Sequence, residues 1–382
     1  MATPAKDGFR MPAEWEPHAG TWMLWPERAD NWRDNAGPAQ RAYAAVAAAI
    51  ARSEPVTMGV SAVQFDLARR MLPKGVRVVE ISSNDAWMRD VGPTFLVNRR
   101  GRARGVDWIF NAWGGKDGGA YLDWALDDQV AAKVLEIETK ARYRAPFILE
   151  GGAIHVDGQG TLLTTEECLL NPNRNPTLSR GQIESLLERY LGVREIIWLS
   201  RGVFNDETDG HVDNLCCFVR PGVVVLTWSD DPGDPQYDIS RTAFEVLDKA
   251  KDSRGRRLEI HKLMQPGPLY MSEAEAAGIE QSPDCKRRRA GDRLAGSYVN
   301  FSIANRHIVM PLLDPKRDRA AKAALARLFP RRKVIGVPSR EILLGGGNIH
   351  CITQQQPRGR QRGRAPLKGT HPFRRRFSDP GH

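Results

Sequence analysis

A single thiol stands at the end of a glycine run near the C-terminus, in Gly345-Gly346-Gly347-Asn348-Ile349-His350-Cys351. Three consecutive glycines cost backbone entropy and add no packing, so they indicate a backbone that turns through positive φ or lies flat against a ligand. The apolar stretches 334–337 and 342–344 lead into the run, which places Cys351 at a strand end or just past a tight turn. Such a thiol is either a nucleophile or a buried structural cysteine, since free cysteine is among the most buried residue types.

Acids and a histidine recur upstream of Cys351 at a spacing near sixty residues, each beside a strand-like stretch. Glu150 follows Asp90 by 60 residues, His211 follows Glu150 by 61 with Asp213 close behind, and Cys351 lies 140 residues beyond His211. Polar residues that recur at strand ends with one period predict a circular or solenoid-like repeat, which aims one edge of each unit at a common centre. If the repeat closes, these five residues meet in space.

The residue types in this set favour chemistry on a cationic substrate. A cysteine thiolate is a strong nucleophile, and a histidine in reach can donate and accept protons through two half-reactions. Three carboxylates would raise one another's pKa and oppose the thiolate, unless the substrate itself brings positive charge. A planar guanidinium pairs bidentately with carboxylates, and its central carbon is open to attack by a thiolate. Trp87 and Trp113 are candidates to cover such a ligand, and Trp113, in a glycine-rich loop, is the better one.

Strands and helices alternate along the chain, which favours an α/β layout. The patterns predict strands over 21–25, 56–60, 76–81, 94–97, 161–165, 215–219, 223–228 and 308–312, and helices over 33–52 and about 62–71. Cys216 and Cys217 fall in one predicted strand, with one side chain on each face. The chain has 382 residues, more than the roughly 250–300 at which single cores stop growing, so we expect either two domains or one domain built from repeats.

Composition restricts the class of protein. Of the net charge of +10, seven charges come from residues 358–382, which contain eight Lys/Arg and one acid, so the remaining 357 residues carry only +3. The nearly balanced body gives no electrostatic sign of a nucleic-acid partner. Five cysteines without a C-x-x-C pair, and no apolar leader, predict a reduced, cytoplasmic protein. No apolar run approaches the roughly 18 residues needed to span a bilayer, so we expect no membrane association.

Five motifs, in order, carry a resemblance to a known family: WMRDVGPTF, FNAWGGK, EGGAIHVDG, DETDGHVDN and GGGNIHCITQQQP. From about residue 11 to residue 357 the chain resembles the agmatine deiminase family, within the guanidine-modifying superfamily that includes the Porphyromonas-type peptidylarginine deiminases. The resemblance implies an α/β fold, the αβ-propeller (pentein) of pseudo-fivefold ββαβ units in one domain over residues 1–357. It implies hydrolysis of agmatine to N-carbamoylputrescine and ammonia, in putrescine and polyamine biosynthesis, with no metal and no organic cofactor.

The resemblance also implies a role for each matched residue. Cys351 resembles the nucleophile that forms an amidino-thioether, and His211 resembles the acid that protonates the leaving group and then activates water. Glu150 resembles the acid that orients this histidine. The remaining matches concern the substrate: Asp90 and Asp213 as guanidinium clamps, Glu207 as a residue associated with agmatine, and Trp87, with Trp113, as the lining of the channel.

Some features leave alternatives open. The tripeptide His-Val-Asp occurs at 155–157 and at 211–213, and spacing does not choose between them; the resemblance selects the second, and the first is interpreted as a turn into the strand at 161. His18, His155, His211, His350 and the acids lack the spacing of a metal site. Another guanidine, such as free or peptidyl arginine, or an amidinotransferase reaction, would suit the same residues. The sequence leaves a homo-oligomer open.

The segment 358–382 departs from the family, whose similar members end soon after the QQQP segment. It is basic and poor in aliphatic residues, and we expect it to be a disordered tail. Such a tail could bind nucleic acid or an acidic surface, which keeps a non-catalytic, nucleic-acid-binding propeller as a rival, or it could be a silent extension. Because it begins within a few residues of Cys351, it could also disturb the closing strand and impair activity.

Overall fold

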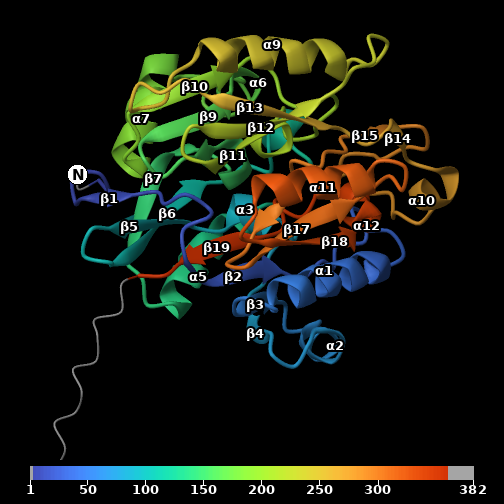
Figure 1. The fold of residues 1–382 in the computed structure, drawn as a ribbon. Helices are drawn as coiled ribbons and strands as arrows, with labels where there is room; N and C mark the ends of the chain where they lie inside the picture. Colours follow the sequence, from blue (N-terminus) through green and yellow to red (C-terminus); the bar gives the residue numbers. More distant parts are fainter. Residues whose placement is uncertain (1–2, 360–382) are drawn as a thin grey trace, which may run out of the picture.

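The computed structural model describes residues 3–359, and their strands form an α/β arrangement of separate small sheets (Figure 1). Most of the sequence-predicted tail therefore lies outside the described residues. Within the described part, three- and four-stranded sheets alternate along the chain with helices, which confirms the predicted α/β class. No helix among these residues has the length and apolarity needed to cross a membrane.

One strand pattern recurs in the sheets of three or four strands: an antiparallel pair whose second strand is joined by a parallel neighbour. The strands that follow it are β19 (Gln354–Pro357), β2 (His18–Leu24) and β3 (Val56–Val60); β5 (Thr94–Asn98), β6 (Ala103–Ile109) and β7 (Arg142–Ile148); β8 (His155–Val156), β9 (Thr161–Thr165) and β10 (Glu195–Leu199); β11 (Cys216–Arg220), β12 (Val223–Trp228) and β13 (Glu259–Met264); and β16 (Ser302–Ile303), β17 (His307–Leu312) and β18 (Lys333–Pro338). Two edge strands extend the first two sheets, β4 (Arg77–Glu80) beside β3 and β1 (Phe9–Arg10) beside β5, and β14 (Leu269–Tyr270) with β15 (Arg293–Leu294) forms a separate ribbon.

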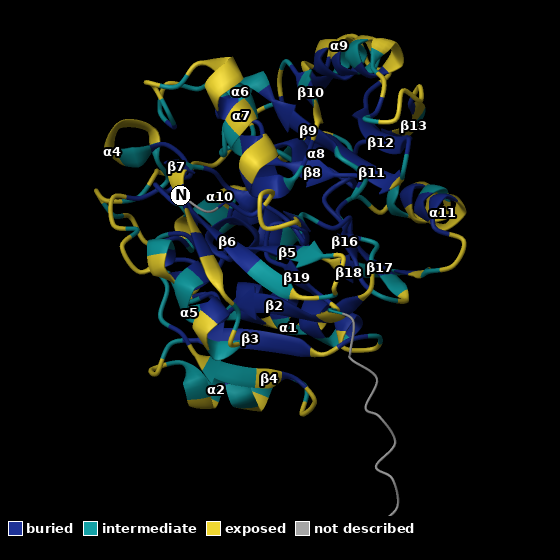
Figure 2. Cartoon of the chain, turned by 90° about the vertical axis from the view of Figure 1, so that its left-hand side faces the viewer, coloured by how far each residue is buried: buried dark blue, intermediate teal, exposed yellow. Residues whose placement is uncertain are grey.

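Longer helices link the parallel strands, as parallel connections require. They are α1 (Gly37–Ile50), α2 (Phe65–Met71), α5 (Val130–Ile137), α7 (Arg180–Leu191), α9 (Gln236–Lys249) and α11 (Asp318–Leu328). Figure 2 shows the strands buried in the interior, while α9 and α11 carry exposed faces at the periphery. Shorter helices are α3 (Met88–Val91), α4 (Gly115–Gly118), η1 (Asp127–Gln129), η2 (Gly151–Ala153), α6 (Glu166–Leu169), α8 (Val212–Leu215), α10 (Glu273–Ala277) and α12 (Arg340–Leu344).

The last strand of the chain pairs with the second. β19 runs antiparallel to β2, with Gln354 opposite Trp22, so the C-terminal segment lies beside the N-terminal one in a single sheet (Figure 1). Cys351 lies in the turn just before β19, as the sequence predicted. The apolar stretch at 342–344 belongs to the short helix α12. This pairing lets a residue near the end of the chain meet side chains from its beginning.

Local details agree with most of the sequence patterns. Cys216 packs with Leu226 in one hydrophobic cluster and Cys217 with Phe301 in another, so β11 has one cysteine on each face. The interpretation of His155 as part of a turn was wrong: it lies in β8, buried, and pairs with Leu163 of β9. The turn begins two residues later.

Candidate functional site

Short turns and helices at strand ends bring the predicted residues together. Asp90 lies in α3, Glu150 directly precedes η2, and His211 and Asp213 lie at the start of α8. All five side chains, with Cys351, are buried. His211 Nδ1 lies 3.9 Å from Asp90 Oδ1, His211 Nε2 lies 3.9 Å from Glu150 Oε2, and Cys351 Sγ lies 3.6 Å from Asp213 Oδ2. Residues spread over more than 260 positions of the chain therefore form one cluster.

Gly152 stands at the middle of this cluster. A Cβ atom at this position would lie 2.5 Å from His211 Nδ1 and 3.0 Å from both Asp213 Oδ2 and Asp90 Oδ1, which is closer than real Cβ contacts. Its backbone N–H donates to Asp90 Oδ1 at 2.9 Å. Only a residue without a side chain lets the three groups converge, which explains the second glycine of the Glu-Gly-Gly motif.

The glycine run before Cys351 is explained by close packing and one positive φ. A Cβ at Gly345 would lie 2.2 Å from the ring of Trp32, and one at Gly347 would lie 2.5 Å from the ring of Trp87. Gly346 has a φ of +109°, a region that side chains disfavour. The run thus brings the backbone flat against two indoles and directs Cys351 into the cluster.

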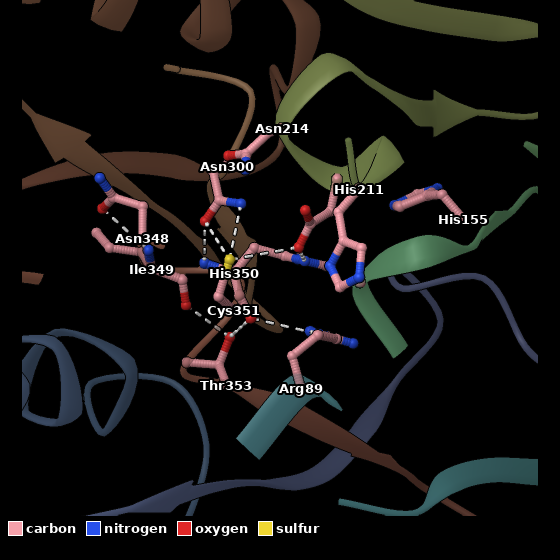
Figure 3. Close-up of polar contacts among 12 residues, drawn as sticks. Arg89, His155, His211, Asn214, Asn300, Asn348, Ile349, His350, Cys351 and Thr353 are labelled. Carbon is pink, nitrogen blue, oxygen red and sulfur yellow. Dashed lines mark hydrogen bonds and ion pairs between the residues drawn. The ribbon is translucent and has the colours of Figure 1, made fainter. Parts of the chain in front are cut away.

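The environment of Cys351 favours the thiol when no substrate is bound. Asn300 Nδ2 donates to Sγ at 3.2 Å, and the amide oxygen of the same residue lies 3.5 Å away (Figure 3). Burial raises the pKa of Cys351 well above its ordinary value, and the carboxylates of Asp213 and Asp90 raise it further. A cation placed beside Sγ would reverse the effect of the carboxylates and favour the thiolate.

His211 lies between two acids in the described site and is held in its charged form. Burial alone would lower its pKa, but the charge of Asp90 and the neighbouring Glu150 raise the pKa well above the ordinary value. Its Nε2 and the facing Glu150 Oε2 have no hydrogen-bond partner among the described residues, at a separation too long for a hydrogen bond. An imidazolium with an uncommitted N–H can supply a proton to a bound group.

Asp90 is the acid whose charge is least secure. Burial raises its pKa to about 6; the charge of His211 opposes this, while Asp213 and Glu150 add to it. Trp113 Nε1 donates to Oδ2 at 3.0 Å and the backbone of η2 to Oδ1, so the carboxylate is fixed in orientation.

Arg174, which the sequence did not single out, holds Glu150 in its charged form. Its Nε donates to Glu150 Oε1 at 2.7 Å and its Nη1 to Asp209 Oδ2 at 2.7 Å, with the guanidinium fully buried. Burial would raise the pKa of Glu150, but the charge of Arg174, helped by His211, lowers it to about 2. A buried ion pair of this kind therefore supports the acid beside His211.

Replacing Arg174 with alanine is expected to destabilise the fold by about 3–5 kcal/mol, because it leaves the Glu150 carboxylate buried without its counter-charge. Chemical denaturation measures the loss of unfolding free energy. Arg180→Ala is the matched control: Arg180 pairs with Glu166 on the surface, and exposed pairs contribute about 0–1 kcal/mol. Equal losses in the two variants would contradict the assigned role of Arg174.

A pocket leads to Cys351 and encloses about 470 Å³ of space, its open mouth included. Both predicted indoles line it: the Trp87 and Trp113 rings stand edge to face, 6.4 Å apart, and Trp87 Nε1 donates to Asp85 at 2.8 Å. The pocket has further lining residues of opposite charge, among them Asp90, Glu207, Lys286 and Arg288. Its shape and its apolar walls suit a slender, cationic molecule.

Glu207, also predicted, is paired where it lines the pocket. Arg288 Nη1 donates to Glu207 Oε1 at 2.5 Å, Arg288 Nε donates to Asn31 at 3.0 Å, and Nη2 donates to the carbonyl of Gly345 at 2.6 Å. The guanidinium is thus shared among three acceptors. The sequence gave no sign of this arginine at the pocket, since it lies in no matched motif.

Two groups of buried side chains in the described part come close enough to be weighed as metal sites: Glu14, His155 and His350, and Glu150, Cys168 and His211. In the first, His155 Nδ1 accepts the Phe218 N–H at 3.2 Å, so its proton is on Nε2, the nitrogen that faces Glu14. A nitrogen that carries a proton is not a metal ligand, and hydrogen bonding accounts for this group.

In the second group a metal ion would have to replace the proton of His211 and lie beside the guanidinium of Arg174. The raised pKa of His211 makes the first step unfavourable, and the charge of Arg174 makes the second unfavourable. The donor set thus suits proton transfer better than metal binding.

Comparison with known proteins agrees with this geometry. The model of the Porphyromonas-type peptidyl-arginine deiminase family matches residues 10–357. An agmatine deiminase of Pseudomonas aeruginosa (strain LESB58) is 60% identical over 362 residues, covering 94% of this chain and 98% of the relative, and one of Stutzerimonas stutzeri (strain A1501) is 60% identical over 359 residues, covering 93% and 97%. The solved agmatine deiminase of Enterococcus faecalis superposes with a TM-score of 0.91 at 46% identity, covering 94% of this chain and 98% of that one. The chain belongs to the Porphyromonas-type peptidyl-arginine deiminase family.

Proposed function

We propose that this chain is an agmatine deiminase, a hydrolase that converts agmatine to N-carbamoylputrescine and ammonia through a covalent intermediate on Cys351. The observation that carries the proposal is the cluster at the base of the pocket, where a thiol faces Asp213 and an imidazolium lies between Asp90 and Glu150. The relatives at 60% identity are agmatine deiminases, which supports the same substrate here. Putrescine and polyamine biosynthesis is the pathway that this product serves.

The charges of the site suggest an order of steps. The guanidinium of the substrate pairs with the Asp90 and Asp213 carboxylates, and its positive charge beside Sγ lowers the pKa of the Cys351 thiol. The thiolate attacks the guanidinium carbon, and His211 donates its proton to the leaving nitrogen, which departs as ammonia. The neutral imidazole then takes a proton from water, which attacks the amidino carbon and releases the cysteine. Glu150 keeps His211 oriented and charged between turnovers.

The fold and the setting form part of the same proposal. The shared strand pattern and the pairing of β19 with β2 support a closed αβ-propeller of pseudo-fivefold ββαβ units over residues 1–357. The five cysteines are unpaired in the structure, which supports a reducing, cytoplasmic location.

A rival substrate is free or peptidyl arginine, and the pocket offers an argument on each side. A carboxylate would need a cation near the mouth, and Lys286 and Arg288 line the pocket. Arg288, however, is already shared among Glu207, Asn31 and the Gly345 carbonyl. The nearby Glu207 carboxylate would repel the carboxylate of arginine and attract the ammonium of agmatine.

Ammonia release from agmatine, arginine and a peptidyl-arginine, measured in parallel, tests the proposed function. We expect turnover of agmatine with a kcat/KM at least about 100-fold above that for arginine, since about 3 kcal/mol separates an attractive from a repulsive charge contact. Preference for arginine would transfer the assignment to the rival. Failure of the folded protein to turn over any guanidine would refute deimination.

The acid side of the pH profile should report Asp90. Its pKa in the folded protein is about 6, so the carboxylate is charged above that pH and is protonated below it. A neutral Asp90 does not pair with the guanidinium, and we therefore expect kcat/KM to fall as the pH drops through about 6. Asp90→Asn should lower kcat/KM by about 10²-fold or more at pH 8 and remove this limb. An unchanged limb in the variant would assign it to another group.

A further inference from the structure

A buried chain of polar contacts extends from the pocket to the N-terminal segment. Cys351 Sγ lies 3.6 Å from Asp213 Oδ2, the same oxygen lies 2.8 Å from His350 Nδ1, and His350 Nε2 lies 3.1 Å from Glu14 Oε2. Each of these side chains is at most 5% exposed. Glu14 and His350 have no part in the proposed chemical steps, although both are buried and ionisable.

The proton count along this chain determines the state of His350. A carboxylate only accepts hydrogen bonds, and a neutral imidazole donates one, so both contacts are hydrogen bonds only if His350 carries two protons or one of the acids is protonated. The directions of the pKa shifts favour the first: burial lowers the pKa of His350, but Glu14 and Asp213 raise it above its ordinary value. The pKa values of Glu14 and Asp213 are both lowered in spite of their burial, chiefly by His350.

Other charged groups lie around His350. Arg89 lowers its pKa, and the ring of His155 lies 6.2 Å away between centroids (Figure 3). His155 is not a competing cation, because burial lowers its pKa and its proton is directed at Glu14. Glu14 and Asp213 are thus the two groups that keep His350 charged against Arg89. Loss of either should neutralise it.

The two oxygens of Asp213 have different surroundings. Oδ2 is held by His350, whereas Oδ1 is buried without a hydrogen-bond partner among the described residues. A buried acceptor left unpaired costs free energy unless a ligand satisfies it. Oδ1 is therefore available to an N–H of the bound guanidinium, while Oδ2, partly neutralised by the imidazolium, faces Cys351 Sγ with reduced repulsion toward a thiolate.

We propose that Glu14 and His350 are positioning residues for Asp213. Glu14 keeps His350 charged and oriented, and His350 holds Asp213 so that one oxygen meets the substrate and the charge of the other is offset beside the sulfur. Glu14 is itself fixed by the Ile303 N–H, which donates to its second oxygen at 2.8 Å. The inference rests on the proposed function in taking Asp213 as the guanidinium clamp.

Glu14→Gln tests the proposal with two readouts. In the resting enzyme, ¹⁵N NMR of labelled histidine reports the protonation of His350, whose signal is assigned by its loss in His350→Gln. We expect an imidazolium at pH 7.5 in the wild type and a neutral ring in Glu14→Gln. With agmatine, the variant should lose about 10- to 100-fold in kcat/KM, mainly through KM, and its activity should decline at lower pH on the alkaline side.

Two further variants make the test decisive. Glu16→Gln is the matched control, since Glu16 lies two residues on and pairs with the part-exposed Arg10; it should leave the NMR signal and the pH profile unchanged. Glu14→Asp, which restores the charge, should return His350 to the imidazolium form, and it replaces Glu14→Gln if that variant does not fold. A neutral His350 in the wild type, or an unmoved pH profile in a folded Glu14→Gln, would overturn the proposal. The NMR result holds whether or not agmatine is the substrate, so failure of the proposed function is distinguishable as a wild type that turns over no agmatine.

Discussion

Replacement of Cys351 by alanine is expected to lower the release of ammonia from agmatine by more than about 10⁴-fold, because it removes the atom that forms the covalent bond. The side chain is buried and small, and alanine leaves only a small void, so the fold should persist. Intact-mass spectrometry of rapidly quenched enzyme should detect a wild-type adduct with the mass of agmatine less ammonia. The adduct should be missing from the variant. This single substitution separates covalent catalysis from direct attack by water.

Cys285→Ser is the matched control for this experiment. Cys285 is the other cysteine among the described residues that line the pocket, and its Sγ lies 3.4 Å from the backbone carbonyl of Asp30, away from the acids around Cys351. Its variant should keep both turnover and adduct. Turnover that survives in Cys351→Ala, or an adduct that disappears in Cys285→Ser, would refute Cys351 as the nucleophile.

The residues of the cluster could be found from the sequence because each stands at a strand end. Asp90, Glu150 and His211 follow one another at nearly equal intervals, and equal intervals in a chain of repeated supersecondary units indicate equivalent places in space. The structure brings them within contact distance of one another. The strand bounds were also accessible, since β3 and β9 are short, apolar stretches with turn residues on both sides.

Other residues of the site could not be found in this way. Arg174 lies 24 residues after Glu150, outside the spacing, and its role depends on burial that no local pattern reveals. Asn300 does fall in the interval that the spacing skipped, but an amide carries no charge to mark it. The link between Glu14 and His350 spans 336 residues and exists only because β19 pairs with β2. Long-range contacts of this kind depend on tertiary packing and not on local periodicity.

The repeated His-Val-Asp tripeptide shows where a pattern alone is insufficient. Both histidines are buried, and both contact an acid, but the acids act in opposite ways on their charge. His211 lies between two carboxylates, and its pKa is raised well above the ordinary value. Burial lowers the pKa of His155, and its single proton is committed to Glu14. Environment, which the tripeptide does not encode, therefore makes one a proton donor and the other a neutral hydrogen-bond donor.

His211→Gln is accordingly expected to lower kcat for agmatine by about 10²–10⁴-fold with a smaller change in KM, because glutamine cannot donate a proton to the leaving nitrogen or accept one from water. His155→Gln is the matched control in the same tripeptide, and it should lose less than about tenfold, since that ring donates only a hydrogen bond to Glu14. Steady-state kinetics, with thermal melts to establish folding, measure both. A loss in a folded His155→Gln equal to that in His211→Gln would remove the distinction between the two histidines, and full activity in His211→Gln would require another acid to protonate the leaving group. Because the two variants change the same residue type in the same local sequence, any difference between them reports the tertiary environment and not the substitution itself.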